Sequence, residues 1–401
     1  MPRRLKTAAH TRRNGIEPPA ELATISERTP LVRVDANGSF SGWHWLATGF
    51  DEVRAILSND DGFSMLPPPT QMHSAAGHVE IGNLLQYDPP DHTRLRKMLV
   101  PEFTVRRIRR LEPFVTEIVA DCLDAVEAAG QPADLMRTFA LPIPGLVGCA
   151  LLGVPRDDAA DLARNFTSSR AAATDQRTDP RERERLRAAG NAYVTYMRRL
   201  VRQKRRSPGD DLLGMLIREH GANISDEELT GTAATLLGSS IENVGGMLAL
   251  APLALFQYPD QLALLLERPE LTEQAVEELL RYVSSVPNSI PRYALRDVEV
   301  GGQLIRTGEV VMCSLLAVNR SQLPGVPQDT LDLTRDSSGH IAFGHGIHHC
   351  LGASLARLEL RIGVPALLRR FPGLRLAVPP EQLRYRTWTP NYGVDELPVA
   401  W

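Results

Sequence analysis

Most of the chain has the apolar spacing of amphipathic helices. Apolar residues recur three and four positions apart, with charged residues between them, over residues 106–129, 179–204, 226–258 and 259–283. Shorter segments typical of strands occur at residues 31–35, 298–305 and 309–315, and Gly301-Gly302 offers a tight turn inside this strand-rich stretch. The pattern therefore predicts a mainly α protein with a small β region.

No part of the sequence is typical of a linker between domains. Segments rich in proline, glycine or serine interrupt the helical pattern at residues 66–70, 207–210, 286–291 and 372–380, but each is short, and no internal repeat is present. We predict one domain over residues 1–401, with residues 1–20 as a flexible N-terminal segment.

Composition and charge fit an ordinary globular protein of 401 residues, 43% hydrophobic and 23% charged. The formal net charge of −3 gives no overall attraction to nucleic acid or to an anionic membrane. Residues 1–14 are basic and polar, and the longest apolar stretch, near residues 247–256, is short and contains Pro252. We therefore expect a cytoplasmic protein that binds neither membranes nor nucleic acid.

The four cysteines are widely separated, which argues against a disulfide framework. Cys122, Cys149 and Cys313 lie in apolar surroundings and are expected to be buried fillers of the core. Cys350 is different because glycines and histidines surround it.

Cys350 ends a glycine-rich loop, Phe-Gly-His-Gly-Ile-His-His-Cys-Leu-Gly over residues 343–352, just before a predicted helix at 353–368. Backbone N–H groups at a helix start favour a thiolate, which is the form that binds metal. The glycines, Gly344, Gly346 and Gly352, would let the backbone approach a large flat ligand. A lone thiolate on haem iron favours O–O cleavage, and His348 is placed to hydrogen-bond a haem propionate.

Two other interpretations of this loop are open. A zinc site could use His345, His348, His349 and Cys350, but such sites usually need regular ligand spacing and a second cluster, and no CxxC or HxxxH partner occurs. A purely structural glycine turn with a core cysteine is the other alternative. We favour haem ligation over both.

The loop resembles the signature of the cytochrome P450 family, F-G-x-G-x-H-x-C-x-G, and matches it at every fixed position. The resemblance implies a triangular, mostly helical prism in which haem b lies between two helices. It implies Cys350 as the iron ligand and Phe343, Gly344 and Gly352 as haem-binding residues. It further implies electrons from NAD(P)H delivered through a ferredoxin reductase and a ferredoxin.

Glu278 and Arg281 stand three residues apart on one helical face, where they can form an ion pair. Alone, this spacing is weak evidence, since any solvated helix offers such a pair. Beside the cysteine loop it resembles the family's E-x-x-R element, and Arg335 resembles the third partner. The implied role of these residues is structural, to hold the cysteine loop.

His92 and Arg96 lie four residues apart on one face of a helix that Pro89-Pro90 would start. The resemblance implies that both bind haem propionates together with Arg292. Solvated surface cations are the alternative.

A basic cluster follows in the next segment, formed by Arg106, Arg107, Arg109 and Arg110. Such clusters are usually solvated faces. In the family, the surface on the cysteine side of the haem receives an acidic electron donor, so ferredoxin docking at this cluster is a hypothesis.

The long apolar helix contains small residues and an acid where the family has A-G-x-[DE]-T. Ser239 and Ser240 take the place of the small pair and Glu242 that of the acid, as expected for a helix that opens a groove for O₂ and water. Asn243 stands where the family usually has threonine. An amide cannot relay a proton by simple rotation, so water, a serine or a substrate group would have to complete the path.

Three oxidative outcomes follow from this departure. We favour hydroxylation, with protons arriving through Glu242; the enzyme could instead remove hydrogen from an aromatic N–H or O–H and couple radicals without inserting oxygen. Other oxidations, such as desaturation or ring formation, are the third outcome. A haem-based sensor or carrier is a rival from another class, but it would not need Glu242.

The resemblance also indicates which residues line the substrate pocket. These are Met65, Leu85, Gln86, Leu236, Gly238, Ser285, Val286, Ile290 and Asn391. The mixture suits a mid-sized, mostly apolar natural product with a few hydrogen-bonding groups, such as a polyketide, a terpenoid or an aromatic cyclic dipeptide.

Overall fold

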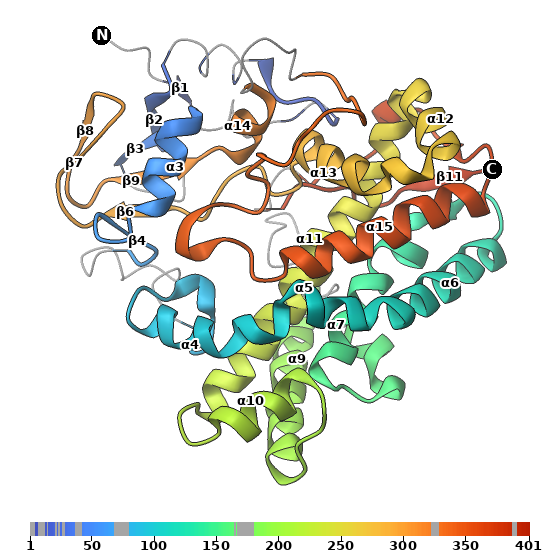
Figure 1. Cartoon of the computed structure of the whole chain (residues 1–401), viewed down its shortest axis with the longest axis horizontal. Coiled ribbons are helices and arrows are strands. Elements are labelled where there is room, and N and C mark those ends of the chain that lie inside the picture. The colour runs from blue at the N-terminus through green and yellow to red at the C-terminus, as the bar shows by residue number, and fades with distance from the viewer. Residues whose placement is uncertain are drawn as a thin grey trace.

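Helix α11 (Asp226–Gln257) runs through the middle of the molecule in the computed structural model (Figure 1). The structure describes residues 5–6, 13, 15–20, 22, 25, 29–36, 42–67, 80–163, 166, 180–321, 329–386 and 391–401. The helix begins at a capping box, in which the Ser225 side chain accepts from the Glu228 N–H and the Glu228 carboxylate accepts from the Ser225 N–H. Its apolar residues are buried by helices on several sides.

The helices packed directly against α11 are α7 (Pro142–Leu152), α9 (Pro180–Arg206), α12 (Pro259–Glu267), α13 (Thr272–Val283) and α15 (Ala353–Arg370). The remaining helices are α3 (Phe50–Ser58), α4 (Asp91–Leu99), α5 (Val105–Ile108), α6 (Glu112–Ala129), α10 (Leu212–His220) and α14 (Leu315–Ser321), with a π-helical turn at Met136–Ala140. Short 3₁₀ turns include η3 (Leu84–Gln86), η5 (Arg109–Leu111), η7 (Pro269–Leu271) and η8 (Gly346–His348). One large apolar core joins most of these helices, whereas α3 and α14 belong to smaller apolar clusters beside the larger sheet.

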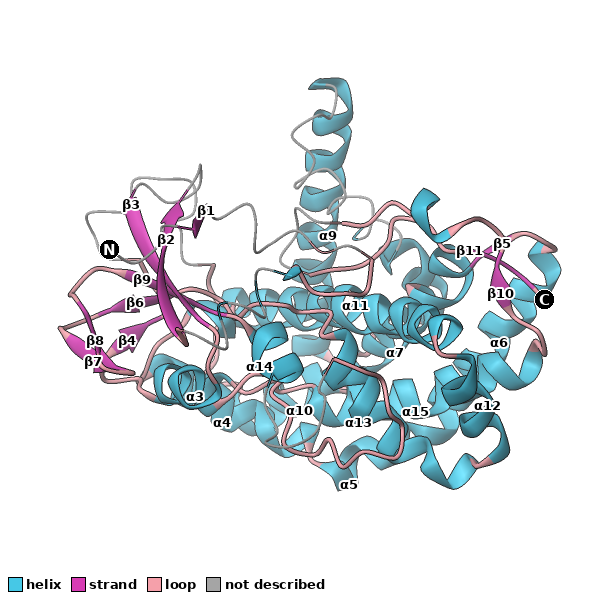
Figure 2. Cartoon of the chain, turned by 90° about the horizontal axis from the view of Figure 1, so that it is seen from above, coloured by secondary structure: helices cyan, strands magenta, loops and turns pink. Residues whose placement is uncertain are grey.

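A six-stranded sheet occupies one end of the molecule, and a three-stranded sheet lies at the opposite end (Figure 2). The larger sheet has the order β1 (Leu5–Lys6), β2 (Leu31–Ala36), β3 (Gly42–Ala47), β9 (Val310–Cys313), β6 (Arg292–Ala294), β4 (Phe63–Ser64). The smaller one has the order β10 (Arg375–Leu376), β11 (Pro398–Ala400), β5 (Ala133–Asp134), and β7 (Val298–Val300) forms a hairpin with β8 (Gln303–Ile305). Antiparallel pairing of β2 with β3 sets Leu31 opposite Ala47.

The predicted fold class, mainly α with a small β region, is confirmed. Two predicted helices are interrupted. The range 106–129 divides into α5, η5 and α6, and Pro269 divides 259–283 because proline has no N–H for the helical hydrogen bond. The turn at Gly301-Gly302 is present, with φ of 55° and 71°. Cys122, Cys149 and Cys313 are buried as expected.

One described helix, α11, is long and apolar enough to cross a membrane by length and composition, but 72% of its most apolar window is buried inside the protein. Neighbouring helices therefore cover the surface that lipid would otherwise contact.

The N-terminal segment is packed where the structure describes it. The Arg13 guanidinium donates to the carbonyls of Val283 (2.9 Å), Ser284 (3.3 Å) and Ile16 (2.6 Å), and it lies 4.2 Å from the centroid of the Tyr392 ring. Ile16 is buried. Arg13 therefore caps the C-terminal carbonyls of α13, and the flexibility expected of residues 1–20 stays a prediction; most of residues 1–14 lie outside the described residues.

Candidate functional site

The cysteine loop folds back on itself before α15 begins. The Cys350 N–H donates to the Phe343 carbonyl at 2.9 Å, and the His349 N–H donates to the Gly346 carbonyl at 3.0 Å. Cys350 is exposed, unlike the other three cysteines. Its sulfur is thus available at the loop's end, immediately before the helix start.

The loop glycines serve different purposes. A Cβ added at Gly344 (φ 74°) or Gly352 would meet no atom within 4 Å among the described residues, so the backbone faces open space on which a flat ligand can lie. A Cβ at Gly346 would lie 2.1 Å from the Leu57 carbonyl oxygen at the end of α3. Gly346 makes the expected tight turn, with φ of 74°, and its close approach is to protein backbone; its part in ligand binding stays a prediction.

Burial raises the pKa of the Cys350 thiol, and a hydrogen bond from Gly352 and the charges of Arg96 and Arg357 offset this only in part. The Cys350 side chain is thus accessible, but the protein atoms around its sulfur disfavour the charged form. The backbone N–H of Gly352 at the helix start favours the thiolate as expected, but desolvation of the sulfur outweighs it. A cation bound directly to the sulfur would remove the proton outright.

Four basic side chains from three elements converge near Cys350: His92 and Arg96 on α4, Arg292 on β6 and His348 on η8. The ring centroids of His92 and His348 lie 4.2 Å apart. Burial, followed by the charges of His92, Arg292 and Arg96, lowers the pKa of His348 to about 3. Positive charge on any one of these four side chains therefore disfavours positive charge on the others, unless an anion lies among them.

Both ring nitrogens of His92 are buried and have no hydrogen-bond partner within the part of the chain that the structure describes. Such unsatisfied groups are costly, so a ligand with acceptor oxygens is expected beside them. The thiol of Cys350, the open glycine backbone and this cationic group together fit a haem with two propionates. No group of three or more His, Cys, Asp or Glu side chains in the described ranges could hold a lone metal ion, so the zinc alternative lacks a ligand set.

Arg96 and Arg292 also have protein acceptors. The Arg96 guanidinium donates to the His349 carbonyl at 2.6 Å, which ties α4 to the cysteine loop. Arg292 is buried and donates to the Ile290 carbonyl at 2.9 Å. Each retains further N–H groups for an anion, because a guanidinium has five donors.

The middle of α11 is less buried than the apolar stretch that follows it. Ser239, Ser240, Glu242 and Asn243 are half-buried, whereas residues 244–255 are buried throughout. Gly238 does not open this surface, because a Cβ there would lie 2.7 Å from the Phe166 ring. The glycine permits close packing with that ring, and the place of Gly238 in the substrate pocket stays a prediction.

The acid of α11 contacts the C-terminal turn. The Asn391 side chain donates to the Glu242 carboxylate at 2.9 Å, and the Arg386 guanidinium lies close enough for Glu242 to affect its pKa. The Asn243 Oδ1 atom is buried and lacks a hydrogen-bond partner among the described residues. Sequence reasoning placed Asn391 here but missed Arg386, for which no local motif gives a signal.

The other predicted pocket residues are distributed around this region. Met65 and Ser285 are buried, Leu236 and Val286 are half-buried, and Leu85 and Ile290 are exposed; Gln86 accepts a hydrogen bond from the Glu80 N–H at 2.7 Å. The C-terminal turn meets α11 and the segment after α13 at Gly246, where a Cβ would lie 3.3 Å from the Tyr392 carbonyl oxygen and 3.8 Å from Ser285 Cβ. Met65 lines a small cavity together with Ile347 and with two of the four basic side chains, Arg292 and His348.

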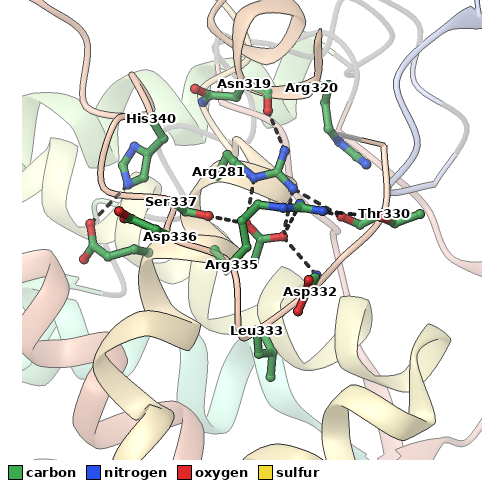
Figure 3. A network of polar contacts seen from close by, with 12 residues as sticks. Arg281, Asn319, Arg320, Thr330, Asp332, Leu333, Arg335, Asp336, Ser337 and His340 are labelled. Carbon is green, nitrogen blue, oxygen red and sulfur yellow. Dashed lines mark hydrogen bonds and ion pairs between the residues drawn. The ribbon is translucent and has the colours of Figure 1, made fainter. Parts of the chain in front are cut away.

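Figure 3 shows a network of polar contacts around Arg281 and Arg335, and the buried Glu278 carboxylate is its centre. Arg281 donates to both of its carboxylate oxygens, at 2.6 and 2.8 Å, and Arg335 donates at 2.8 Å. The Ser337 hydroxyl and the Asp332 N–H donate as well. The ion pair expected from the E-x-x-R spacing and its third partner are thus both present, and Glu278 is 0% exposed.

The same network reaches the start of the cysteine loop. Arg281 also donates to the Asn319 carbonyl at 2.6 Å, and the Ile341 N–H donates to Asn319 Oδ1 at 2.9 Å. Because Ile341 lies two residues before Phe343, the buried ion pairs restrain the entrance to the loop.

The basic cluster is partly neutralised within the chain. Arg107 donates to Glu102, with Nε at 2.9 Å, whereas Arg106, Arg109 and Arg110 are exposed. These arginines belong to α5 and η5, and α5 packs against α15, the helix that follows Cys350.

Comparison with known proteins gives consistent results. Residues 45–382 match the family model described as Cytochrome P450. Cytochrome P450 165C4 from Amycolatopsis orientalis is 42% identical over 97% of this chain and 95% of its own length. Nocardicin C N-oxygenase from Nocardia uniformis subsp. tsuyamanensis is 42% identical over 89% of each protein.

Two solved structures are similar over nearly the whole chain. OxyE, a cytochrome P450 involved in teicoplanin biosynthesis, superposes with a TM-score of 0.88 at 45% identity and covers 98% of this chain and 99% of its own. OxyC, implicated in an oxidative C–C coupling reaction during vancomycin biosynthesis, superposes with a TM-score of 0.89 at 40% identity and covers 100% and 98%.

Proposed function

This chain belongs to the cytochrome P450 family, and from that premise we propose that it joins aromatic groups of a mid-sized natural product by oxidative coupling, without inserting oxygen. The family makes it a haem-dependent oxidoreductase. The coupling chemistry and the substrate class are proposals that rest on the site.

The residues proposed to hold the haem are those that converge on the cysteine loop. Cys350 would ligate the iron, and Phe343, Gly344 and Gly352 would flank the macrocycle. His92, Arg96, Arg292 and His348 would bind the propionates as charge-assisted or neutral hydrogen-bond donors. When bound, the haem supplies oxygen activation and one-electron oxidation.

Asn243 is the observation that carries the proposal of coupling. At this position the family usually has an alcohol, which can donate and accept hydrogen bonds by rotating about one bond. The Asn243 Oδ1 atom is buried and lacks a partner among the described residues, so it can accept a hydrogen bond from a phenol O–H or an indole N–H. A substrate held in this way would have its phenol or indole group fixed in place, and loss of one electron to the bound haem and of one proton from that group would start radical coupling.

The similar proteins agree with this choice but do not decide it. OxyC is implicated in oxidative C–C coupling, whereas a relative of similar identity is an N-oxygenase. Oxygen insertion is therefore the second candidate, supported by Glu242 and the half-buried Ser239 and Ser240, which could complete a proton path with water. A haem-based sensor or carrier would not need an acid such as Glu242 in this helix, because it does not deliver protons to bound oxygen.

Electron supply is proposed to come from NAD(P)H through a ferredoxin reductase and a ferredoxin in the cytoplasm. The exposed Arg106, Arg109 and Arg110 lie on elements next to α15 and suit an acidic donor. Charge reversal at Arg110 should raise the ferredoxin concentration needed for half-maximal reduction at low salt. Unchanged reduction kinetics would exclude docking at this cluster.

The test of coupling against insertion is the product mass under ¹⁸O₂. The haem-loaded enzyme is given a ferredoxin system and a panel of aromatic peptides, beginning with tryptophan-containing cyclic dipeptides and tyrosine-containing linear peptides. Coupling predicts a product that has lost two hydrogen atoms and carries no ¹⁸O. A product that has gained an ¹⁸O atom would overturn the proposal in favour of hydroxylation.

A further inference from the structure

Glu277, the neighbour of the E-x-x-R glutamate, belongs to a second polar cluster. Its carboxylate accepts hydrogen bonds from Arg357 on α15, with Nε and Nη2 each at 2.7 Å, and from His340 Nε2 at 3.2 Å. The His340 contact is visible in Figure 3 beside the Glu278 network. The paired geometry fixes the guanidinium plane as well as its position. Glu277 thus joins α13, α15 and the segment before the cysteine loop.

The Arg357 guanidinium lies between this carboxylate and the cysteine loop. Its Cζ atom is 4.5 Å from the centroid of the Phe343 ring, close enough for a cation–π contact. The Phe343 carbonyl accepts the hydrogen bond from the Cys350 N–H at 2.9 Å. The charge of Arg357 acts on the Cys350 sulfur, where it favours the thiolate.

The cluster carries defined charges at neutral pH. Burial raises the pKa of Glu277, but the hydrogen bonds and charges of His340 and Arg357 outweigh burial and hold the pKa at about 2, so Glu277 is a carboxylate. His340 Nδ1 accepts a hydrogen bond from the Ala342 N–H at 3.1 Å, so His340 Nε2 carries the proton that is donated to Glu277. Arg361 is a more distant cation, at 3.9 Å from Glu277. One negative charge therefore faces Arg357 directly.

We propose that Glu277 is a positioning residue that lowers the reduction potential of the haem ligated by Cys350, by cancelling part of the positive charge that Arg357 places against Phe343. The inference rests on the proposed haem-thiolate site and is independent of whether the enzyme couples or inserts oxygen. Reduction of the haem adds negative charge, so a more positive field at the sulfur raises the potential. Opposite charges around one site must then shift the potential in opposite directions.

Redox titration of the purified, haem-loaded, substrate-free protein tests this inference. Glu277→Gln should raise the midpoint potential and Arg357→Gln should lower it, each by roughly a tenfold change in the ferrous-to-ferric ratio, or about 59 mV for one electron. The double variant should return toward the wild-type value. Glu273→Gln is the matched control, because Glu273 is an exposed acid one turn earlier on α13 that pairs with Arg361; its potential should stay at the wild-type value.

A merely structural role predicts a different pattern. If both single variants shift the potential in the same direction, or if Glu277→Gln behaves like Glu273→Gln, the inference is wrong. Where a glutamine variant fails to retain haem, Arg357→Lys and Glu277→Asp keep the charges, and each should keep the potential close to the wild-type value; a shift as large as that of charge removal contradicts the inference. Failure of the haem-thiolate proposal itself would appear separately, as a wild-type ferrous–CO spectrum without a red-shifted Soret band.

Discussion

Replacing Glu359 with glutamine would measure how a buried acid affects the stability of this protein as the pH changes. Glu359 lies on α15 and is 0% exposed. Neither of its carboxylate oxygens has a hydrogen-bond partner in the described part of the chain, and burial raises its pKa from 4.5 to about 8. The side chain is thus protonated in the folded protein at neutral pH.

The sign of the effect follows from proton binding. Between pH 4.5 and pH 8 the folded state holds a proton on Glu359 that the unfolded chain has released, so stability is lost as the pH rises through this range. The interval between the two pKa values corresponds to about 5 kcal/mol at about 1.36 kcal/mol per unit of pKa. Because this figure takes the full interval between the two pKa values, it is an upper bound on the free energy of unfolding that titration of Glu359 removes.

Glu359→Gln should remove this dependence, because an amide does not titrate. The variant and the wild type should have similar free energies of unfolding at pH 5, and the variant should be more stable by several kcal/mol at pH 8. Urea titration of the haem-loaded proteins, followed by far-UV circular dichroism at both pH values, gives the two differences.

The matched control is Glu267→Gln, at an exposed acid that ends α12, for which we expect the same small difference at pH 5 and pH 8. If the difference between Glu359→Gln and the wild type is the same at both pH values, Glu359 has no raised pKa in the folded state. The argument from burial would then be refuted.

Other predictions concern the loop, its support and the oxygen helix. Glu278→Gln leaves the buried side chains of Arg281 and Arg335 without a counter-charge. It should therefore lower the free energy of unfolding by about 3–5 kcal/mol and lower the haem content per mole of purified protein. Gly346→Ala should lower the melting temperature more than Gly352→Ala, because its Cβ would meet the backbone of α3 at 2.1 Å whereas Gly352 faces open space; Gly352→Ala should instead weaken haem binding. Asn243→Thr should change the fraction of electrons lost as hydrogen peroxide; an unchanged fraction would remove Asn243 from oxygen activation.

Local patterns predicted most of the helices because each needs only its own apolar spacing and termini. The breaks inside two of them depend on single residues such as Pro269, whose effect a periodicity window averages out. Strand β3 was missed because its stability comes from pairing with β2 and with the distant β9, which no local pattern records.

In the candidate site too, residues within one local motif could be predicted, whereas contacts between distant segments could not. Cys350 and its glycines form a contiguous motif, whereas the meeting of His92, Arg292 and His348 depends on tertiary packing and was expected only from the family resemblance. Glu277 and Arg357 were missed because their hydrogen bonds join segments 80 residues apart. Arg386 was missed for the same reason.

The ferrous–CO absorption spectrum tests the central claim, that Cys350 ligates a haem iron, most directly. The reduced wild-type protein should show the strongly red-shifted Soret band of thiolate ligation, and Cys350→Ala should lack it. A haem-loaded wild type without that band, or a Cys350→Ala variant whose spectrum matches the wild type, would contradict the account.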